Sequence, residues 1–182
     1  NEDIQYVLKS HFNETPYDPM GDSPENKTYR AISLSRTAQS HILQVRNDKK
    51  YKTSVHWIEL GVPAFNPYVP FFANADDTDE SYRNVPEKMD LKCAFWLNEA
   101  LAEVVESHYN EFIEKNEWAR RQIAEVDKEA AQLDGQSLVD YLTKQNHEVA
   151  AHYNERTKEL FFELLTEGCE LSKMSFKMDP NL

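Results

Sequence analysis

The chain has 182 residues, 40% hydrophobic and 12% aromatic, which is enough for a folded core and excludes an intrinsically disordered protein. Its formal net charge of -12 argues against nucleic acid or an anionic membrane as a partner, because both need a basic surface. No stretch approaches the roughly 20 consecutive apolar residues that a membrane-spanning helix needs, so we expect no membrane partner either.

Residues 1–27 are predicted to form a helix followed by a surface loop. Ile4, Val7 and Leu8 recur at helical spacing, which predicts a helix from Asn1 to about Phe12, with Asn1 as its N-cap. The rest of this segment contains several prolines and a glycine, which exclude regular structure.

Residues 28–73 are predicted to form antiparallel strands. Ile32 alternates with serines, which places the start of the first strand near residue 28. Residues 41–46 and 54–60 alternate in the same way, and the polar segment 47–50 is a predicted turn between them. Residues 68–72 can be extended as well, but nearby prolines restrict them to a sheet edge or a loop.

Both faces of the hairpin are partly apolar, so we expect it to be covered on both sides, or on one side and by a cleft. The predicted turn places His41 opposite His56 or Trp57 on the facing strand, depending on the register.

Residues 90–168 are predicted to form long antiparallel helices, because apolar residues recur at helical spacing throughout. Gly135 interrupts the pattern, and Ser137 with Asp140 predicts a capping box at the start of another helix. Gly168 is the predicted C-terminal stop of that helix, and residues 169–182 form a tail.

These segments predict an α+β fold in which helices pack on one face of an antiparallel sheet. A sheet of so few strands is a poor partner for such long helices. We therefore expect residues 1–182 to be the C-terminal portion of a larger domain whose remaining strands come from upstream sequence.

Motifs for a metal or a phosphate-bearing cofactor are missing from the sequence. It has no His-Glu-x-x-His motif and no glycine-rich phosphate loop, so we expect no metal and no cofactor. It also has no Gly-x-Ser-x-Gly elbow, the motif that carries a nucleophilic serine. Cys93 and Cys169 lie in helical patterns, and we interpret them as free, buried thiols of a cytoplasmic protein rather than nucleophiles. No catalytic residue is assigned within the chain.

Four residues are candidates for a substrate pocket. Arg36 precedes a break between strand-like runs and can bind a carboxylate through two parallel hydrogen bonds, although a structural salt bridge is the alternative. His41 and Trp57 can contact a substrate from the sheet, or pack locally. Asn66 can offer its amide to a substrate or brace its own loop, which is rich in proline and aromatic residues and can line a cleft for peptides.

Four motifs occur in the same order in one family: Arg-Thr-x-x-Ser-His-Ile-x-Gln-x-Arg (36–46), Trp-x-x-x-Gly (57–61), Asn-x-Tyr-Val-Pro (66–70) and Phe-Trp-x-Asn (95–98). The chain thereby resembles the cysteine dipeptidases of the N-terminal-nucleophile hydrolase superfamily, the group around bacterial dipeptidase A. The resemblance implies an αββα sandwich and hydrolysis of dipeptides by an N-terminal cysteine whose own amino group is the base.

Because the chain starts at Asn1, the resemblance also implies that the nucleophile lies outside it and that the chain alone is inactive. Small peptides are then the expected partners, and apolar helix faces would favour a homo-oligomer. The alternatives are a non-catalytic, secernin-like interaction protein of the same fold, and an independent α+β binding module.

Overall fold

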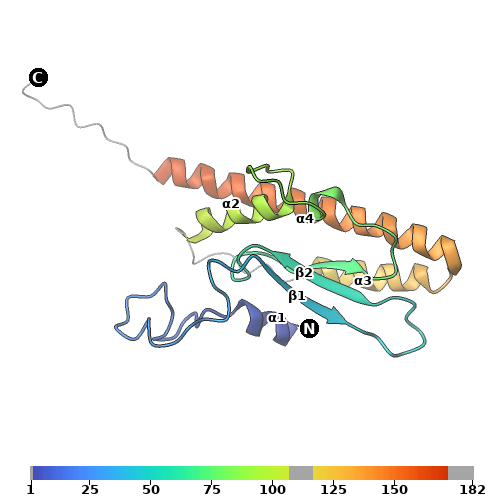
Figure 1. The fold of residues 1–182 in the computed structure, drawn as a ribbon, viewed down its shortest axis with the longest axis horizontal. Coiled ribbons are helices and arrows are strands. Elements are labelled where there is room, and N and C mark those ends of the chain that lie inside the picture. The colour runs from blue at the N-terminus through green and yellow to red at the C-terminus, as the bar shows by residue number, and fades with distance from the viewer. Residues whose placement is uncertain (1, 107–116, 172–182) are drawn as a thin grey trace, which may run out of the picture.

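A three-stranded antiparallel sheet and a set of helices that pack against it make up the fold (Figure 1). The computed structural model describes residues 2–106 and 117–171. The strands are β1 (Gln39–Gln44), β2 (Val55–Leu60) and β3 (Val69–Phe72), and the sheet order is β1-β2-β3. The helices are α1 (Glu2–Lys9), the short 3-10 helix η1 (Glu80–Tyr82), α2 (Ala94–Glu106), α3 (Glu117–Ala130) and α4 (Gly135–Leu171). The α+β class and the long C-terminal helix are confirmed.

The hairpin β1–β2 and the extended segment at β3 agree with the prediction. The predicted strand near residues 28–34 does not form. There the backbone makes local turns and contacts the end of α1, since Thr37 N–H donates to Leu34 O at 2.9 Å and Ser33 N–H to Ser10 O at 2.9 Å. Among the described residues no strand pairs with this segment, so the alternation of Ile32 with serine does not mark a sheet, and Ile32 is 52% exposed.

The predicted hairpin register is also wrong. His41 pairs with Ile58, and His56 pairs with Leu43, so His41 faces neither His56 nor Trp57 directly. The centre of the connection lies between Lys49 and Lys50, one residue later than the polar segment suggested. A register shift of this size is set by the geometry of the loop, which the alternating pattern does not encode.

One face of the sheet forms the main core. Ile42, Trp57 and Phe72 project from the three strands and pack with Val126 of α3 and Leu142 of α4. β3 is buried throughout, whereas Leu43 on the opposite face of β1 is 67% exposed. The hairpin was expected to be covered on both faces, or on one face and by a cleft; among the described residues its outer face is open at Leu43 of β1.

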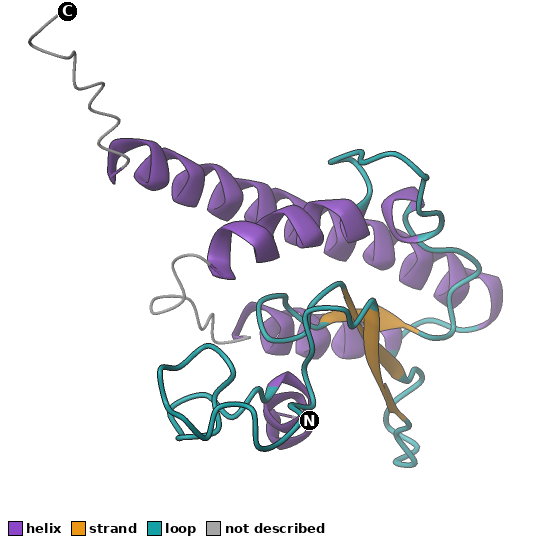
Figure 2. Cartoon of the chain, turned by 60° about the vertical axis from the view of Figure 1, so that its left-hand side comes forward, coloured by secondary structure: helices purple, strands orange, loops and turns teal. Residues whose placement is uncertain are grey.

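Helix α4 covers the outer edge of β3. The side-chain amide of Asn146 makes the two hydrogen bonds that a paired strand would make. Phe72 N–H donates to Asn146 Oδ1 at 2.8 Å, and Asn146 Nδ2 donates to Phe72 O at 3.2 Å. Figure 2 shows α2 and α4 running side by side, and α4 contacts both α2 and β3. An edge that would otherwise template pairing with another chain is thus blocked by a side chain.

We expect Asn146→Ala to lower the free energy of unfolding by about 2–4 kcal/mol, because it leaves the buried N–H and C=O of Phe72 without partners. Asn154→Ala is the matched control on the same helix, since it removes one half-buried hydrogen bond to the Ser81 hydroxyl. Urea unfolding of both variants tests this, and an equal loss in the two would contradict the role of Asn146.

The ends of α4 differ from the prediction. The helix starts at Gly135, so Ser137 lies inside its first turn, and Asp140 accepts a hydrogen bond from Gln136 Nε2 at 2.9 Å rather than closing a capping box. It also continues through Gly168 to Leu171, because one glycine costs only about 1 kcal/mol in a helix interior. The predicted N-cap Asn1 and most of the predicted tail lie outside the described residues.

Among residues 2–106 and 117–171, no helix combines the length and the apolar character needed to cross a membrane.

Candidate functional site

Polar side chains gather where β2 ends, and we call this group the strand-end cluster. Glu59 shares a face of β2 with Val55 and Trp57, because side chains alternate along a strand. Its partner across the sheet is Ser40 of β1. The loop 61–68 then returns to the sheet, and α2 starts beside it. The cluster consists of Ser40, Glu59, Asn66, Tyr68, Asn98 and Glu99.

Gly61 makes the close approach of these side chains possible. Its φ of 98° is a backbone conformation that residues with a side chain rarely adopt. A Cβ atom at this position would lie 3.0 Å from Glu99 Oε1 and 3.1 Å from Asn66 Nδ2. Two side chains of the cluster therefore fill the space that the glycine leaves, and any substitution of Gly61 would displace both.

Hydrogen bonds fix the rim of the strand-end cluster. The hydroxyl groups of Ser40 and Tyr68 are 2.5 Å apart. Asn98 Nδ2 donates to Leu60 O at 2.7 Å, and Asn66 Nδ2 donates to Val62 O at 3.1 Å. The Asn66 amide thus braces its own loop, which is the alternative that the sequence left open beside a substrate contact.

Glu59 is the buried acid of the strand-end cluster. It is fully buried, and neither carboxyl oxygen has a hydrogen-bond partner among the described residues. Burial raises the pKa of Glu59 to about 9; Lys9 and Asn66 act in the opposite direction, and Glu99 adds to the rise. At neutral pH the side chain is therefore a carboxylic acid rather than a carboxylate.

Two neighbouring groups are also biased towards their protonated forms. Burial raises the pKa of Glu99, and the charge of Glu103 raises it further. Burial likewise raises the pKa of Tyr68, although its hydrogen bond with Ser40 opposes the rise. Burial therefore disfavours negative charge on all three of these acidic groups of the strand-end cluster.

Two of the four predicted pocket residues lie at or beside this cluster. Asn66 belongs to it, and Arg36 is exposed on a segment that borders the loop 61–68. Gly61 N–H donates to Ala38 O at 3.0 Å, and Ala64 N–H donates to Ser33 Oγ at 2.8 Å, so the segment 33–38 lies along the start of that loop.

The other two predicted residues lie elsewhere. Trp57 is in the core, where its indole N–H donates to Gln44 Oε1 at 2.9 Å. His41 is exposed on the opposite face of the sheet, and its ring meets that of His56 diagonally at 5.5 Å. Burial and the neighbouring His41 lower the pKa of His56. The sequence analysis missed Glu59 as a site residue, although an acid among the apolar residues of one strand face was the signal.

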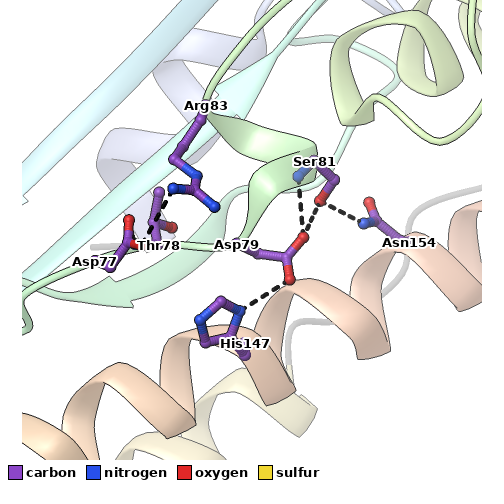
Figure 3. A network of polar contacts seen from close by, with 7 residues as sticks. All are labelled: Asp77, Thr78, Asp79, Ser81, Arg83, His147 and Asn154. Carbon is purple, nitrogen blue, oxygen red and sulfur yellow. Dashed lines mark hydrogen bonds and ion pairs between the residues drawn. The ribbon is translucent and has the colours of Figure 1, made fainter.

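A second polar network joins the loop after β3 to α4 (Figure 3). Asp79 Oδ2 lies 3.0 Å from His147 Nδ1, and the Ser81 hydroxyl donates to Asp79 Oδ1 at 2.6 Å. Burial raises the pKa of Asp79, but the hydrogen bonds from His147 and Ser81 outweigh burial and lower it. Because Ser81 bonds to the acid and not to the histidine, the histidine cannot activate it as a nucleophile. The network fastens η1 to α4.

No three His, Cys, Asp or Glu side chains in the described part of the chain are arranged to hold a metal ion. The two cysteines are in different environments, since Cys93 is buried but Cys169 is exposed, which corrects the expectation that both are buried.

Comparison with known proteins gives a consistent result. The sequence matches peptidase family C69 over residues 1–122. It is 55% identical to a probable dipeptidase of Latilactobacillus sakei, over 100% of this chain and 40% of that protein. It is 33% identical to dipeptidase A of Lactobacillus helveticus, over 97% of this chain and 40% of that protein, and 32% identical to probable dipeptidase B of Lactococcus lactis, over 96% and 39%.

The chain therefore spans about 40% of the length of these relatives. The match to the family covers more than half of the chain, and the similarity to the relatives extends over nearly all of it. The chain belongs to peptidase family C69.

Proposed function

We propose that the protein to which this chain belongs is a dipeptidase that works through an N-terminal cysteine outside residues 1–182. The observation that carries the proposal is the alignment of the whole chain with a relative named a probable dipeptidase, at 55% identity. In this mechanism the cysteine thiolate attacks the peptide carbonyl, its own α-amino group accepts the proton, and water releases the acyl group. The chain alone would then have no hydrolase activity.

The proposed contribution of this chain is one wall of the substrate site. The loop 61–68 is held by hydrogen bonds from its backbone to Ala38 O and to the Ser33 hydroxyl, and by the Asn66 amide. Phe65 from this loop packs with the cluster of Leu101 and Leu164 between α2 and α4, while Tyr68 packs in the sheet core. A loop anchored at both ends in this way provides a rigid, largely apolar surface for peptide side chains.

Within this proposal, Arg36 binds the C-terminal carboxylate of the dipeptide. It is an exposed guanidinium on the segment that borders the loop, and a guanidinium can hold a carboxylate with two parallel hydrogen bonds. His41 and Trp57 are left out of the site, since one lies on the opposite face of the sheet and the other is in the core. The proposal includes a cytoplasmic location, which the buried Cys93 thiol supports.

The test is steady-state kinetics of the full-length gene product on dipeptides. We expect hydrolysis, and we expect Arg36→Gln to raise KM about tenfold or more with a smaller change in kcat, because a charge-assisted contact is worth roughly 1.5–3 kcal/mol. Arg30→Gln, also on an exposed arginine in the same connecting segment, is the matched control and should leave KM unchanged. Equal effects of the two variants would remove Arg36 from the site. An absence of hydrolysis would favour a non-catalytic interaction protein.

A further inference from the structure

An open groove of about 450 Å³ lies between the β1–β2 hairpin and helix α3, and we call it the hairpin groove. It shares no residue with the strand-end cluster or with the proposed wall of the substrate site. Its volume is within the roughly 300–1,000 Å³ that small-molecule sites span. The side chains that give it its chemistry are Arg46, Asp48 and Tyr51 from the hairpin and Arg120, Ile123 and Asp127 from α3.

The floor of the hairpin groove is an ion pair with hydrogen-bonding capacity left over. Arg46 Nη1 lies 2.5 Å from Asp127 Oδ2, and the two side chains are only 9% and 15% exposed. Arg46 Nη2 and Asp127 Oδ1 are buried, and neither has a hydrogen-bond partner among the described residues. Buried polar atoms in folded proteins nearly always have partners. The floor thus holds one unused donor and one unused acceptor on neighbouring side chains.

The rim of the hairpin groove carries a second pair of opposite charges. Arg120 Nε lies 2.9 Å from Glu2 Oε1, and its side chain is 59% exposed. Asp48 Oδ2 lies 3.3 Å from Lys50 Nζ, and its side chain is 55% exposed. Exposed ion pairs of this kind contribute little to stability, so both rim groups can exchange their partners for a ligand at low cost.

The charges that line the hairpin groove are two guanidinium groups and two carboxylates. The groove therefore favours neither a simple anion nor a simple cation, and its charge pattern is complementary to a molecule that carries one charge of each sign. Ile123 and the ring of Tyr51 add an apolar wall beside these charges. An α-amino acid with an apolar side chain is a small molecule with all three features.

We propose that the hairpin groove binds a zwitterionic, apolar α-amino acid. The carboxylate of the ligand meets Arg46 and Arg120, and its ammonium group meets the carboxylates on the opposite side of each pair. Because the unused atoms of the floor are closed off from solvent, side chains of the groove turn as the ligand enters, which is common at binding sites. Amino acids are also what a dipeptidase releases, so under the proposed function this would be a product-sensing site; the binding itself does not depend on that function.

The first experiment is isothermal titration calorimetry of L-leucine into the full-length protein after alkylation of its accessible thiols, which blocks the proposed cysteine site. Saturable binding is expected. L-leucinamide lacks the carboxylate and 4-methylpentanoate lacks the ammonium group, so each should bind about tenfold more weakly or worse, because each loses a charge-assisted contact. Equal binding of the three compounds, or no binding of L-leucine, would overturn the proposal and leave the ion pair as a structural link between the hairpin and α3.

The second experiment locates the binding site. Arg120→Gln is expected to weaken the binding of L-leucine about tenfold. Arg121→Gln is the matched control, since Arg121 is exposed on the same helix but does not line the groove, and it should leave binding unchanged. Arg36→Gln, on the proposed substrate wall, should leave it unchanged as well.

Loss of L-leucine binding in Arg36→Gln but not in Arg120→Gln would place the ligand in the substrate site and overturn the proposal. A full-length protein that binds L-leucine through Arg120 but hydrolyses no dipeptide would refute the proposed function and leave the amino-acid site standing.

Discussion

Replacing Arg46 by methionine is expected to destabilise the protein by about 3–5 kcal/mol, because it leaves the carboxylate of Asp127 without its charge partner. Arg46 Nη1 lies 2.5 Å from Asp127 Oδ2, and the side chain of Arg46 is only 9% exposed. Its Nε donates to Thr53 O at 3.0 Å, and its guanidinium stacks on the ring of Tyr51 at 4.5 Å. One side chain thus ties the β1–β2 hairpin to helix α3.

The chain contains a natural control for this ion pair. Lys52 Nζ lies 2.7 Å from Asp134 Oδ1 and joins the same hairpin to the segment after α3, but Asp134 is 88% exposed. Exposed pairs contribute about 0–1 kcal/mol, so Lys52→Met should cost far less than Arg46→Met. Urea unfolding at constant pH measures both. Equal losses would mean that burial does not determine the contribution of the Arg46 pair, and a double variant with Asp127→Leu should recover part of the loss.

Replacing Glu59 by glutamine is expected to stabilise the protein at neutral pH, unlike most substitutions of buried residues. The pKa of Glu59 is about 9 in the folded state and 4.5 when the side chain is unperturbed, so folding must take up a proton between these values. The stability that the protonated acid gives is complete below pH 4.5 and is lost as the pH rises to about 9. At pH 7 the difference amounts to about 3 kcal/mol, which glutamine avoids because it does not ionise.

The measurement is the free energy of unfolding at several pH values between 5 and 9. The gap between Glu59→Gln and the wild type should widen with pH across this window and stop widening above pH 9. Glu125→Gln, at an exposed position on α3, should follow the wild type throughout. A constant gap would show that Glu59 does not take up a proton on folding.

The spacing of apolar residues and the positions of prolines predicted those helices and strands whose formation depends on the local sequence. The hairpin β1–β2, the restriction of β3 to an edge and the α2, α3 and α4 helices follow from alternation, proline placement and helical spacing. The false strand at Ile32 shows the limit, since its alternation is real but the backbone bonds to turns and to α1. The predicted register failed because the geometry of the loop sets it, and the predicted end of α4 failed because a single glycine is too small a penalty to stop a helix.

The candidate site was harder to predict than the fold. Asn66 was a candidate because it sits in a loop rich in proline and aromatic residues, and Arg36 because it precedes a break between two strand-like runs. Their contact with a substrate stays a prediction. Glu59 has the most strongly shifted pKa of the strand-end cluster. Its place among the apolar residues of one strand face was the signal in the sequence, but its full burial depends on residues that the strand pattern does not show. Its environment is created by residues distant in the sequence, from Lys9 to Glu99.

The most direct test of the account is dipeptide hydrolysis by the full-length protein, assayed before and after alkylation of its thiols. A cysteine nucleophile predicts hydrolysis that alkylation abolishes, with protection by excess dipeptide. Cys93 is buried and lies in this chain, so Cys93→Ala should retain both the activity and its sensitivity to alkylation. Hydrolysis that survives complete alkylation of the accessible thiols would contradict a cysteine mechanism.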